Sequence, residues 1–233
     1  MMHRAKPLQE IYSAEYLPPT LTVDLSLFEV QNDKLCVLLH KRPGEPFQGQ
    51  WALPGGYVAR GETTLQALQK KIQRKTGIDV HALRYLEQSQ VFDVVARDPR
   101  GHAVSVAYIA ANYETETPFN ADEVAFFPVD DLPELAYDHQ HIIDFGRGVL
   151  IDKINSTNLI RAFLSDLFTM SDLQSAYEAV LGHLLDKRNF QKKFFRLNQI
   201  IDTGKLRHNT NSRPAKLYKF KTKTIDPLIN DLD

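Results

Sequence analysis

The stretch Gly56-Tyr57-Val58-Ala59-Arg60-Gly61-Glu62, followed by Lys70-Lys71-Ile72-Gln73-Arg74-Lys75-Thr76-Gly77-Ile78, decides how this 233-residue chain folds. A short apolar run, Trp51-Ala52-Leu53-Pro54, leads into it and is typical of a strand that enters a tight turn. Residues 63–76 have helical spacing, with Leu65, Leu68 and Ile72 on one face. Gly77 is typical of the left-handed residue that ends a helix. The stretch therefore predicts a glycine turn followed by one short amphipathic helix.

The spacing of this stretch resembles the Nudix box, G-x5-E-x7-R-E-U-x-E-E-x-G-U, in which U is a bulky aliphatic residue. In Nudix hydrolases the glutamates of the box hold one to three divalent cations, which clamp a pyrophosphate and activate water. Here Lys71, Arg74 and Lys75 stand at three glutamate positions, and only Glu62 remains. Ammonium and guanidinium groups have no lone pair to offer a metal ion. We therefore expect no metal site, no cofactor, no catalytic residue and no enzyme activity.

The basic helix of the box has two interpretations. Its cations could attract an anionic nucleotide without any metal. Alternatively they could point into solvent and bind nothing, and the sequence does not decide between the two. The run from Trp51 to Gly56, together with the correct spacing of the glycines and aliphatic residues, argues against a chance match to the box.

The composition indicates a folded chain whose N-terminal part and C-terminal third differ in charge. Apolar residues make up 43% and charged residues 24%, so the chain can bury a core. Residues 1–160 carry 15 Lys and Arg against 21 Asp and Glu, whereas residues 161–233 carry 13 against 8. This asymmetry suggests two functions in one chain. With a single cysteine, Cys36, with no apolar signal segment and with no membrane-length apolar run, we expect a cytoplasmic protein.

Periodic segments predict an α+β fold with a mixed sheet flanked by helices in the first domain, residues 1–155. Strands are expected at 21–30, 34–40, 51–56, 83–94, 104–113 and 123–128, and helices at 63–76 and 139–150. A second domain, residues 156–233, has the order of a winged helix-turn-helix. Its helices are expected at 158–168, 172–181 and 187–201, and its strands at 206–207 and 216–220. Ser171 with Gln174 is expected to cap the middle helix, and Asp186 the next one.

The helix that begins after Asp186 has two faces. Phe190, Phe194, Leu197 and Ile201 recur at helical spacing and are expected to be buried. The remaining polar residues suit a recognition helix and wing that bind duplex DNA. The predicted DNA-binding residues are Arg188, Asn189, Lys192, Lys193, Arg196, Arg207, Arg213 and Lys216. The alternative is a solvated basic helix in a protein-interaction module.

Together these stretches resemble one family, the Nudix-related transcriptional regulators of NAD metabolism, over about residues 16–221. The resemblance rests on the run from Pro46 to Gly56, on Asp98-Pro99-Arg100-Gly101, on the run from Phe127 to Pro133, on Asp186-Lys187-Arg188-Asn189-Phe190 and on the run from Arg213 to Tyr218. It implies a Nudix-type α/β/α sandwich followed by a winged helix-turn-helix. Residues 135–139 also belong to it, and there Tyr137 and His139 are expected to be structural, as is Phe127.

The resemblance also implies a function. It implies a homodimer that represses genes of NAD biosynthesis or salvage from a palindromic operator, and that is released by ADP-ribose or a related nucleotide. The residues expected to bind this effector are Trp51, Pro54, Gly55, Gly56, Arg60, Lys71 and Arg74. Two other hypotheses stay open: a metal-dependent hydrolase of ADP-ribose or of another nucleoside diphosphate, and a nucleotide-sensing adaptor whose basic module binds protein or RNA.

Overall fold

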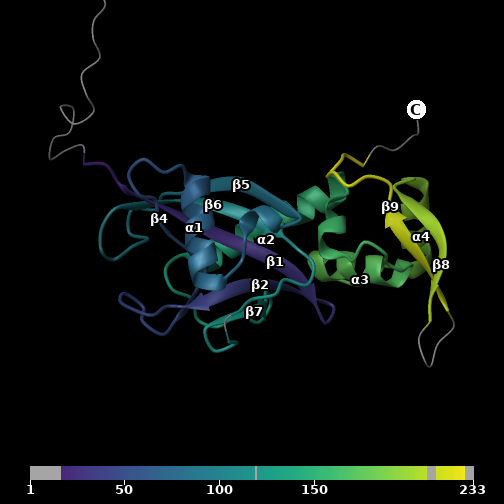
Figure 1. Ribbon diagram of the computed structural model, residues 1–233, viewed down its shortest axis with the longest axis horizontal. Coiled ribbons are helices and arrows are strands. Elements are labelled where there is room, and N and C mark those ends of the chain that lie inside the picture. Colours follow the sequence, from purple (N-terminus) through teal and green to yellow (C-terminus); the bar gives the residue numbers. More distant parts are fainter. Residues whose placement is uncertain (1–16, 119, 209–213, 229–233) are drawn as a thin grey trace, which may run out of the picture.

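The computed structural model describes residues 17–118, 120–208 and 214–228. Figure 1 shows an elongated molecule, in which a sheet with its helices occupies one end and a small group of helices with a hairpin occupies the other. Within these described residues, no helix is both long and apolar enough to cross a membrane.

The N-terminal part is built on one mixed sheet of seven strands. The strands are β1 (Thr20–Gln31), β2 (Lys34–Lys41), β3 (Trp51–Ala52), β4 (Gly55–Tyr57), β5 (Tyr85–Phe92), β6 (Ala103–Ala111) and β7 (Val124–Pro128). Five of them lie in the order β3-β2-β1-β6-β5, while β4 pairs with β1 and β7 with β2. The β1–β6 pair is parallel and the other pairs are antiparallel, which confirms the predicted mixed sheet.

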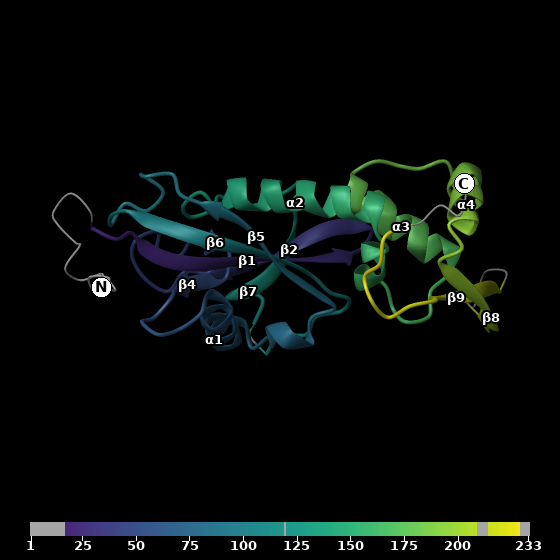
Figure 2. The same ribbon diagram turned by 90° about the horizontal axis from the view of Figure 1, so that it is seen from above.

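Two helices cover the sheet from opposite sides, with α1 (Thr64–Thr76) below it and α2 (His139–Ser156) above it in Figure 2. Between α1 and the sheet lies one apolar cluster, which contains Leu25, Leu68 and Ile72. A second cluster lies on the α2 side and contains Phe28 and Ile142. The α/β/α sandwich predicted for this domain is confirmed. The two faces of β1 carry apolar side chains that belong to different clusters, one under each helix.

Local signals fix both ends of α1. The side chain of Thr63 accepts a hydrogen bond from Gln66 N, and the backbone N–H of Thr63 donates one to Gln66 Oε1, so that the first turn is capped. Gly77 ends the helix with φ of 74°, as predicted. Leu65 was expected on the buried face but is 38% exposed, because Ala67 takes the inward position in the first turn.

The C-terminal part has the helix, helix and hairpin order of a winged helix-turn-helix. It consists of the 3₁₀ segment η3 (Leu159–Phe163), α3 (Met170–Leu181), α4 (Lys187–Arg196), β8 (Ile200–Arg207) and β9 (Ala215–Phe220). Asp186 caps α4 as predicted, since its side chain accepts a hydrogen bond of 2.8 Å from Asn189 N. A second 3₁₀ segment, η2 (Val80–Ala82), follows α1 in the first domain.

Three details of this part differ from the sequence predictions. Residues 158–168 are not a helix beyond η3, because Phe168 exchanges backbone hydrogen bonds of 3.0 and 2.8 Å with Tyr218 and is held extended. The cap of α3 is Thr169, with Asp172 as its partner, rather than Ser171 with Gln174. The third helix stops at Arg196, because Asn198 has φ of 51° and turns the chain into β8. Ile201 therefore lies in a strand and is 41% exposed instead of buried.

The two parts share one apolar core. The cluster on the α2 side of the sheet continues without a break from Phe28 and Leu150 into Phe163, Phe168 and Leu173. At the sheet end of this junction, the turn between β1 and β2 reaches α3, where Ser175 Oγ hydrogen-bonds Asp33. A continuous core resists bending far better than a flexible linker does, so we infer that the positions of the two parts are coupled through their packing.

Candidate functional site

The glycine turn before α1 lies directly against β1. A Cβ atom at Gly55 would come within 2.1 Å of the Val23 carbonyl and 2.4 Å of the Asp24 carboxylate, so only glycine fits there. Gly56 has φ of 151°, a conformation that side chains rarely adopt. These two glycines bring β4 and the start of α1 close to the side chain of Asp24.

A cavity of about 200 Å³ opens beside this turn, and we call it the box cavity. It is formed by Thr22, Asp24, Arg42, Leu53, Gly55, Gly56, Tyr57, Lys71, Arg74, Lys75, Arg97, Asp98, Arg100, Tyr137 and His139. These residues come from β1, β4 and α1, from the loops after β2 and β5, and from the segment that begins α2. Six of the side chains are lysine or arginine and two are aspartate, so that an anion would enter a strongly positive site.

The metal ions of a Nudix box do not fit the residues present here. Glu62 forms an ion pair with Lys70 and also accepts a hydrogen bond of 3.1 Å from Ala59 N. The hydrogen bond from Lys70 is the main cause that lowers the pKa of Glu62. This carboxylate does not line the cavity, and three basic residues point there from α1 instead. Among the described residues, no group of three or more histidine, cysteine, aspartate or glutamate side chains is arranged to hold a metal ion.

A buried ionic network forms the floor of the box cavity. The guanidinium of Arg97 donates hydrogen bonds of 3.0 and 2.7 Å to the two carboxylate oxygens of Asp138. It also lies 3.5 Å from Asp24, which accepts a hydrogen bond of 2.5 Å from Ser105 Oγ. Because Arg97 is only 8% exposed, its charge depends on these two carboxylates. The network joins β1, the loop after β5 and the residue that precedes α2.

His139 completes this floor. Its Nδ1 accepts a hydrogen bond of 2.9 Å from Leu53 N, and its Nε2 lies 3.7 Å from Asp24. Burial lowers the pKa of His139, which keeps the ring neutral and so able to accept that bond. The histidine therefore holds the strand before the glycine turn in place, which agrees with the structural role expected for it.

Tyr137 has a different position from the packing role that the sequence suggested. It lines the box cavity, with φ of 58°. The guanidinium of Arg42 lies 4.8 Å from its ring centroid, and Arg100 donates a hydrogen bond of 3.1 Å to its hydroxyl. Two cations on the cavity wall are thus positioned by one aromatic ring. Phe127, by contrast, does pack, with its ring 4.7 Å from that of Trp51.

Lys75 is the most enclosed cation of the box helix. Its Nζ lies 3.1 Å from His40 Nε2, while His40 Nδ1 faces the carbonyl of Lys41 at 3.2 Å. Burial is the main cause that lowers the pKa of Lys75 to about 8. Burial and the charge of Lys75 together lower the pKa of His40 to about 3, so this histidine is neutral and its Nε2 accepts a hydrogen bond from the Lys75 ammonium.

The residues predicted to bind the effector fall into two groups. Gly55, Gly56, Lys71 and Arg74 line the box cavity. The other three, Trp51, Pro54 and Arg60, do not line it. Trp51 packs on Phe127, the Pro54 carbonyl accepts a hydrogen bond of 3.0 Å from Leu25 N, and Arg60 is exposed in the loop before α1.

Sequence reasoning missed several cavity residues, namely Tyr57, Arg42, Arg97, Asp98, Arg100 and Tyr137. Asp98-Pro99-Arg100-Gly101 was a recognisable turn motif, and this was the available signal for part of the group. Asp98 accepts hydrogen bonds of 3.0 and 2.7 Å from the Arg100 guanidinium, which aims that arginine at the cavity.

The exposed face of α4 carries the predicted basic residues of the recognition helix. Phe194 and Leu197 are buried and Phe190 is half-buried against Tyr177, with ring centroids 5.4 Å apart. The five predicted DNA-binding residues of the helix are all exposed: Arg188, Asn189, Lys192, Lys193 and Arg196. The helix thus presents a continuous polar and cationic surface that no described part of the chain covers.

Two of the predicted wing residues are paired with acidic side chains of this chain. Arg207 donates hydrogen bonds of 3.0 and 2.7 Å to the two carboxylate oxygens of Asp172 on α3, so its charge is already paired. Lys216 forms an ion pair of 2.7 Å with Asp202 across the hairpin and is 63% exposed. Arg213 lies outside the described residues. Direct contact of these three with DNA stays a prediction.

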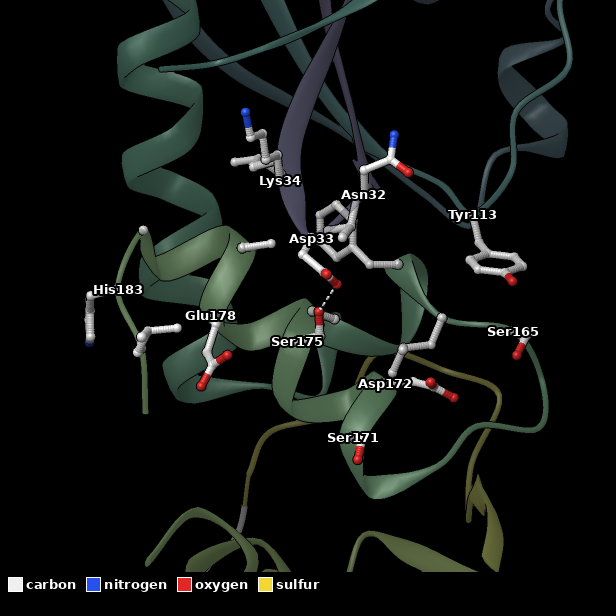
Figure 3. A pocket seen from close by; sticks show the side chains of 18 of the residues that line it. Asn32, Asp33, Lys34, Tyr113, Ser165, Ser171, Asp172, Ser175, Glu178 and His183 are labelled. Atoms are coloured by element: carbon white, nitrogen blue, oxygen red, sulfur yellow. Dashed lines mark hydrogen bonds between the residues drawn. The ribbon is translucent and has the colours of Figure 1, made fainter. Parts of the chain in front are cut away.

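A larger cavity of about 860 Å³ separates the turn between β1 and β2 from α3. Figure 3 shows Asp33 reaching across it to Ser175, with Asp172 and Glu178 on the helix side and Tyr113 and Ser165 on the far wall. Four acids line it, Asp33, Asp130, Asp172 and Glu178, against the two cations Lys34 and Arg207. It lies where the turn after β1 meets α3, between the two parts of the chain.

The fold and the site define a Nudix-type domain, with a basic cavity in place of a metal centre, joined to a winged-helix DNA-binding domain. Family models agree with both halves. A NUDIX domain model matches residues 19–145, and the model of the NrtR DNA-binding winged helix domain matches residues 160–220. The chain belongs to the NrtR family.

Two known relatives cover most of the chain, and a third covers the Nudix part. The ADPR responsive transcriptional repressor NtrR of Acinetobacter baylyi is 31% identical over 227 residues, which are 94% of this chain and 89% of that protein. The crystal structure of Shewanella oneidensis NrtR complexed with a 27mer DNA is 32% identical, with a TM-score of 0.74, and covers 86% of this chain and 93% of that one. An ADP-ribose pyrophosphatase of Methanocaldococcus jannaschii is 38% identical over 130 residues, 55% of this chain and 73% of that protein.

The buried network predicts a large loss of stability when Arg97 is removed. In R97M the side-chain volume is roughly kept, but Asp24 and Asp138 lose their buried counter-charge. We expect the free energy of unfolding in urea to fall by about 3–5 kcal/mol. The exposed Arg60 provides the control, and R60M is expected to change stability by less than about 0.5 kcal/mol. Equal effects of the two substitutions would show that the network does not hold the site together.

Proposed function

We propose that this protein is a transcriptional repressor that binds duplex DNA through α4 and is released when ADP-ribose, or a closely related nucleotide, enters the box cavity. The observation that carries the proposal is one apolar core that joins two cationic surfaces. One is the uncovered face of α4, and the other is the cavity in which basic residues replace metal-binding acids. The names of the similar repressor and of the DNA complex support it. The genes controlled would be those of NAD biosynthesis or salvage.

The chemistry of the box cavity suits a diphosphate. Lys71, Arg74 and Arg100 offer lysine and arginine donors around one space, and arginine can bind phosphate oxygens in pairs. The cavity volume of about 200 Å³ lies below the ~300 Å³ at which pockets for whole drug-sized ligands begin. We therefore place the diphosphate inside it and the adenosine and terminal ribose toward its open sides.

We also propose that the domain does not hydrolyse its ligand. Hydrolysis by a Nudix centre needs carboxylates that gather divalent cations around a water molecule. In this chain Lys71, Arg74 and Lys75 occupy that place, and the remaining Glu62 is paired with Lys70. The likeness to a pyrophosphatase keeps hydrolysis as the second candidate function.

Two elements connect the effector site with the DNA-binding domain. Strand β1 carries Asp24 at the box cavity, and the turn that follows this strand brings Asp33 to Ser175 on α3. Helix α2 begins with His139 at the cavity, and near its end the Ile154 carbonyl accepts a hydrogen bond of 3.4 Å from the hydroxyl of Tyr177 on α3. A nucleotide that prefers one arrangement of these elements would change DNA affinity by its differential affinity for the two arrangements.

The repressor is proposed to act as a homodimer on a palindromic operator, since a two-fold protein matches two half-sites. We place the domain boundary near residues 155 and 156, at the end of α2. The first domain would then be 1–155 and the second 156–233. The resulting recognition surface would comprise the five predicted DNA-binding residues of α4, with Lys216 on the wing.

DNA binding is expected to depend on the exposed face of α4. In the double variant N189A/K192A, operator affinity should fall at least tenfold, because one base-reading amide and one phosphate-binding cation are lost. The slope of log affinity against log salt should shrink by about one unit. Fluorescence anisotropy with operator and random duplexes measures both, and K41A in the first domain is the control. Operator binding that survives N189A/K192A would favour a module that binds protein or RNA.

Effector binding is expected to need Lys71 and Arg74 but no metal. In K71Q/R74Q, calorimetry should show ADP-ribose binding at least tenfold weaker than in the wild type, in the presence of a chelator. The matched control is K70Q, because Lys70 lies on the same helix but pairs with Glu62 outside the cavity. ADP-ribose should release operator DNA from the wild type without Mg²⁺. AMP production on adding Mg²⁺ or Mn²⁺ to a large amount of protein would instead establish the hydrolase.

Effector binding is also expected to weaken as the pH rises through the pKa of Lys75. The pKa of Lys75 is about 8, so its charge is present at pH 7 and is largely lost by pH 9.5. His40, with a pKa of about 3, stays neutral throughout this range. The dissociation constant for ADP-ribose should therefore rise several-fold between pH 7 and 9.5 in the wild type. In K75M, ADP-ribose binding should be weaker at pH 7, and its dissociation constant should change little between pH 7 and 9.5. Parallel curves for the two proteins would exclude Lys75 as the cause.

A further inference from the structure

A second cationic cavity lies at the junction of the two domains, away from both the box cavity and α4. It has a volume of about 220 Å³. Four of its residues are basic: Arg84, Arg161, Lys219 and Lys223. One acid, Asp166, also lines it, and the side chain of that aspartate is 91% exposed. The lining therefore carries an excess of three positive charges around a space that is closed on several sides.

Arg161 is the least satisfied of these cations. Its Nε is buried and has no hydrogen-bond partner among the described residues. Burial, and then the charge of Arg84, lower the pKa of Arg161, while the charges of Asp166 and Asp226 oppose this with smaller effects. A buried guanidinium nitrogen without a partner is rare in folded proteins, and an unseen ion or water is one of its ordinary explanations.

The other cations leave the cavity open to an anion. Arg84 is fixed by a hydrogen bond of 2.5 Å to the Leu164 carbonyl and by an ion pair of 3.4 Å with Asp166. Within the part of the chain that the structure describes, no carboxylate forms an ion pair with Lys219 or Lys223. Repulsion among four cations opposes this arrangement, so an anion that neutralises them would stabilise the fold.

We propose that this junction cavity binds a phosphate group of a small free molecule, with inorganic phosphate as its simplest form. The charge excess suits a dianion better than a carboxylate, and arginine forks match phosphate oxygens in pairs. The volume holds one phosphate with a small substituent but no whole dinucleotide. Arg84 belongs to the Nudix domain, whereas Arg161 and Lys219 belong to the winged helix, so the bound phosphate ties the two domains together.

The test is titration of the full-length protein with inorganic phosphate at constant ionic strength, followed by calorimetry and by the thermal unfolding midpoint. It is carried out in the wild type and in K71Q/R74Q, which disables the box cavity. Both proteins are expected to bind phosphate and to unfold at higher temperature when it is present. R161M should weaken this binding at least tenfold, and K219M/K223M, which alters only exposed lysines, at least fivefold.

The matched control is K187M/K205M, which removes two exposed lysines of the same domain outside the cavity. An equal loss in this control would mean general attraction to a basic domain and would overturn the proposal. So would absence of binding in the wild type, or loss of binding in K71Q/R74Q. If K219M/K223M instead lowers the salt dependence of operator binding by about two units, the lysines contact the DNA backbone, and a small free ligand is excluded. The result does not depend on whether ADP-ribose is the effector.

Discussion

The buried pairing of Arg97 with Asp24 and Asp138 is the constraint on which the rest of the site depends. A guanidinium this far from solvent is tolerated only when its charge is met by well-placed carboxylates. Each carboxylate comes from a different element, one from β1 and one from the residue before α2. The pairing therefore fixes the distance between the sheet and the start of that helix. The walls of the box cavity, including Tyr137 next to Asp138, follow from that distance.

The same two elements lead away from the cavity into the second domain. Strand β1 ends at a turn that meets α3, and α2 packs into the apolar cluster that continues through Phe163 and Phe168. A well-packed core transmits a displacement instead of absorbing it, because its side chains have few alternative arrangements. A shift of Asp24 or Asp138 on ligand binding would thus move the base of the winged helix. Within the described residues, one apolar cluster joins the sheet to the winged helix without interruption.

The parts of the fold that sequence reasoning predicted well are those specified by local, periodic signals. Residues a few positions apart decide three of these features: the glycine turn, α1 with its end at Gly77, and the cap of α4 at Asp186. The errors arose where distant residues decide. Phe168 is held extended by Tyr218, fifty residues later in the chain, so the helix predicted at 158–168 does not continue and the cap of α3 moves to Thr169. No local pattern contains that information.

The residues of the candidate site also fall into those that a local motif predicts and those that only the fold brings together. Lys71 and Arg74 were found because the box motif fixes their positions, whereas Arg42 and Arg97 come from loops that only the folded sheet brings together. Their placement clarifies why basic residues can replace the acids of the box without unfolding the domain. Asp24, Asp98 and Asp138 already neutralise Arg97 and Arg100, which leaves the positive excess on α1 and Arg42. That excess faces the cavity, where a diphosphate can use it. If nothing there cleaves the ligand, occupancy follows the free nucleotide concentration at equilibrium, which is the property a sensor needs.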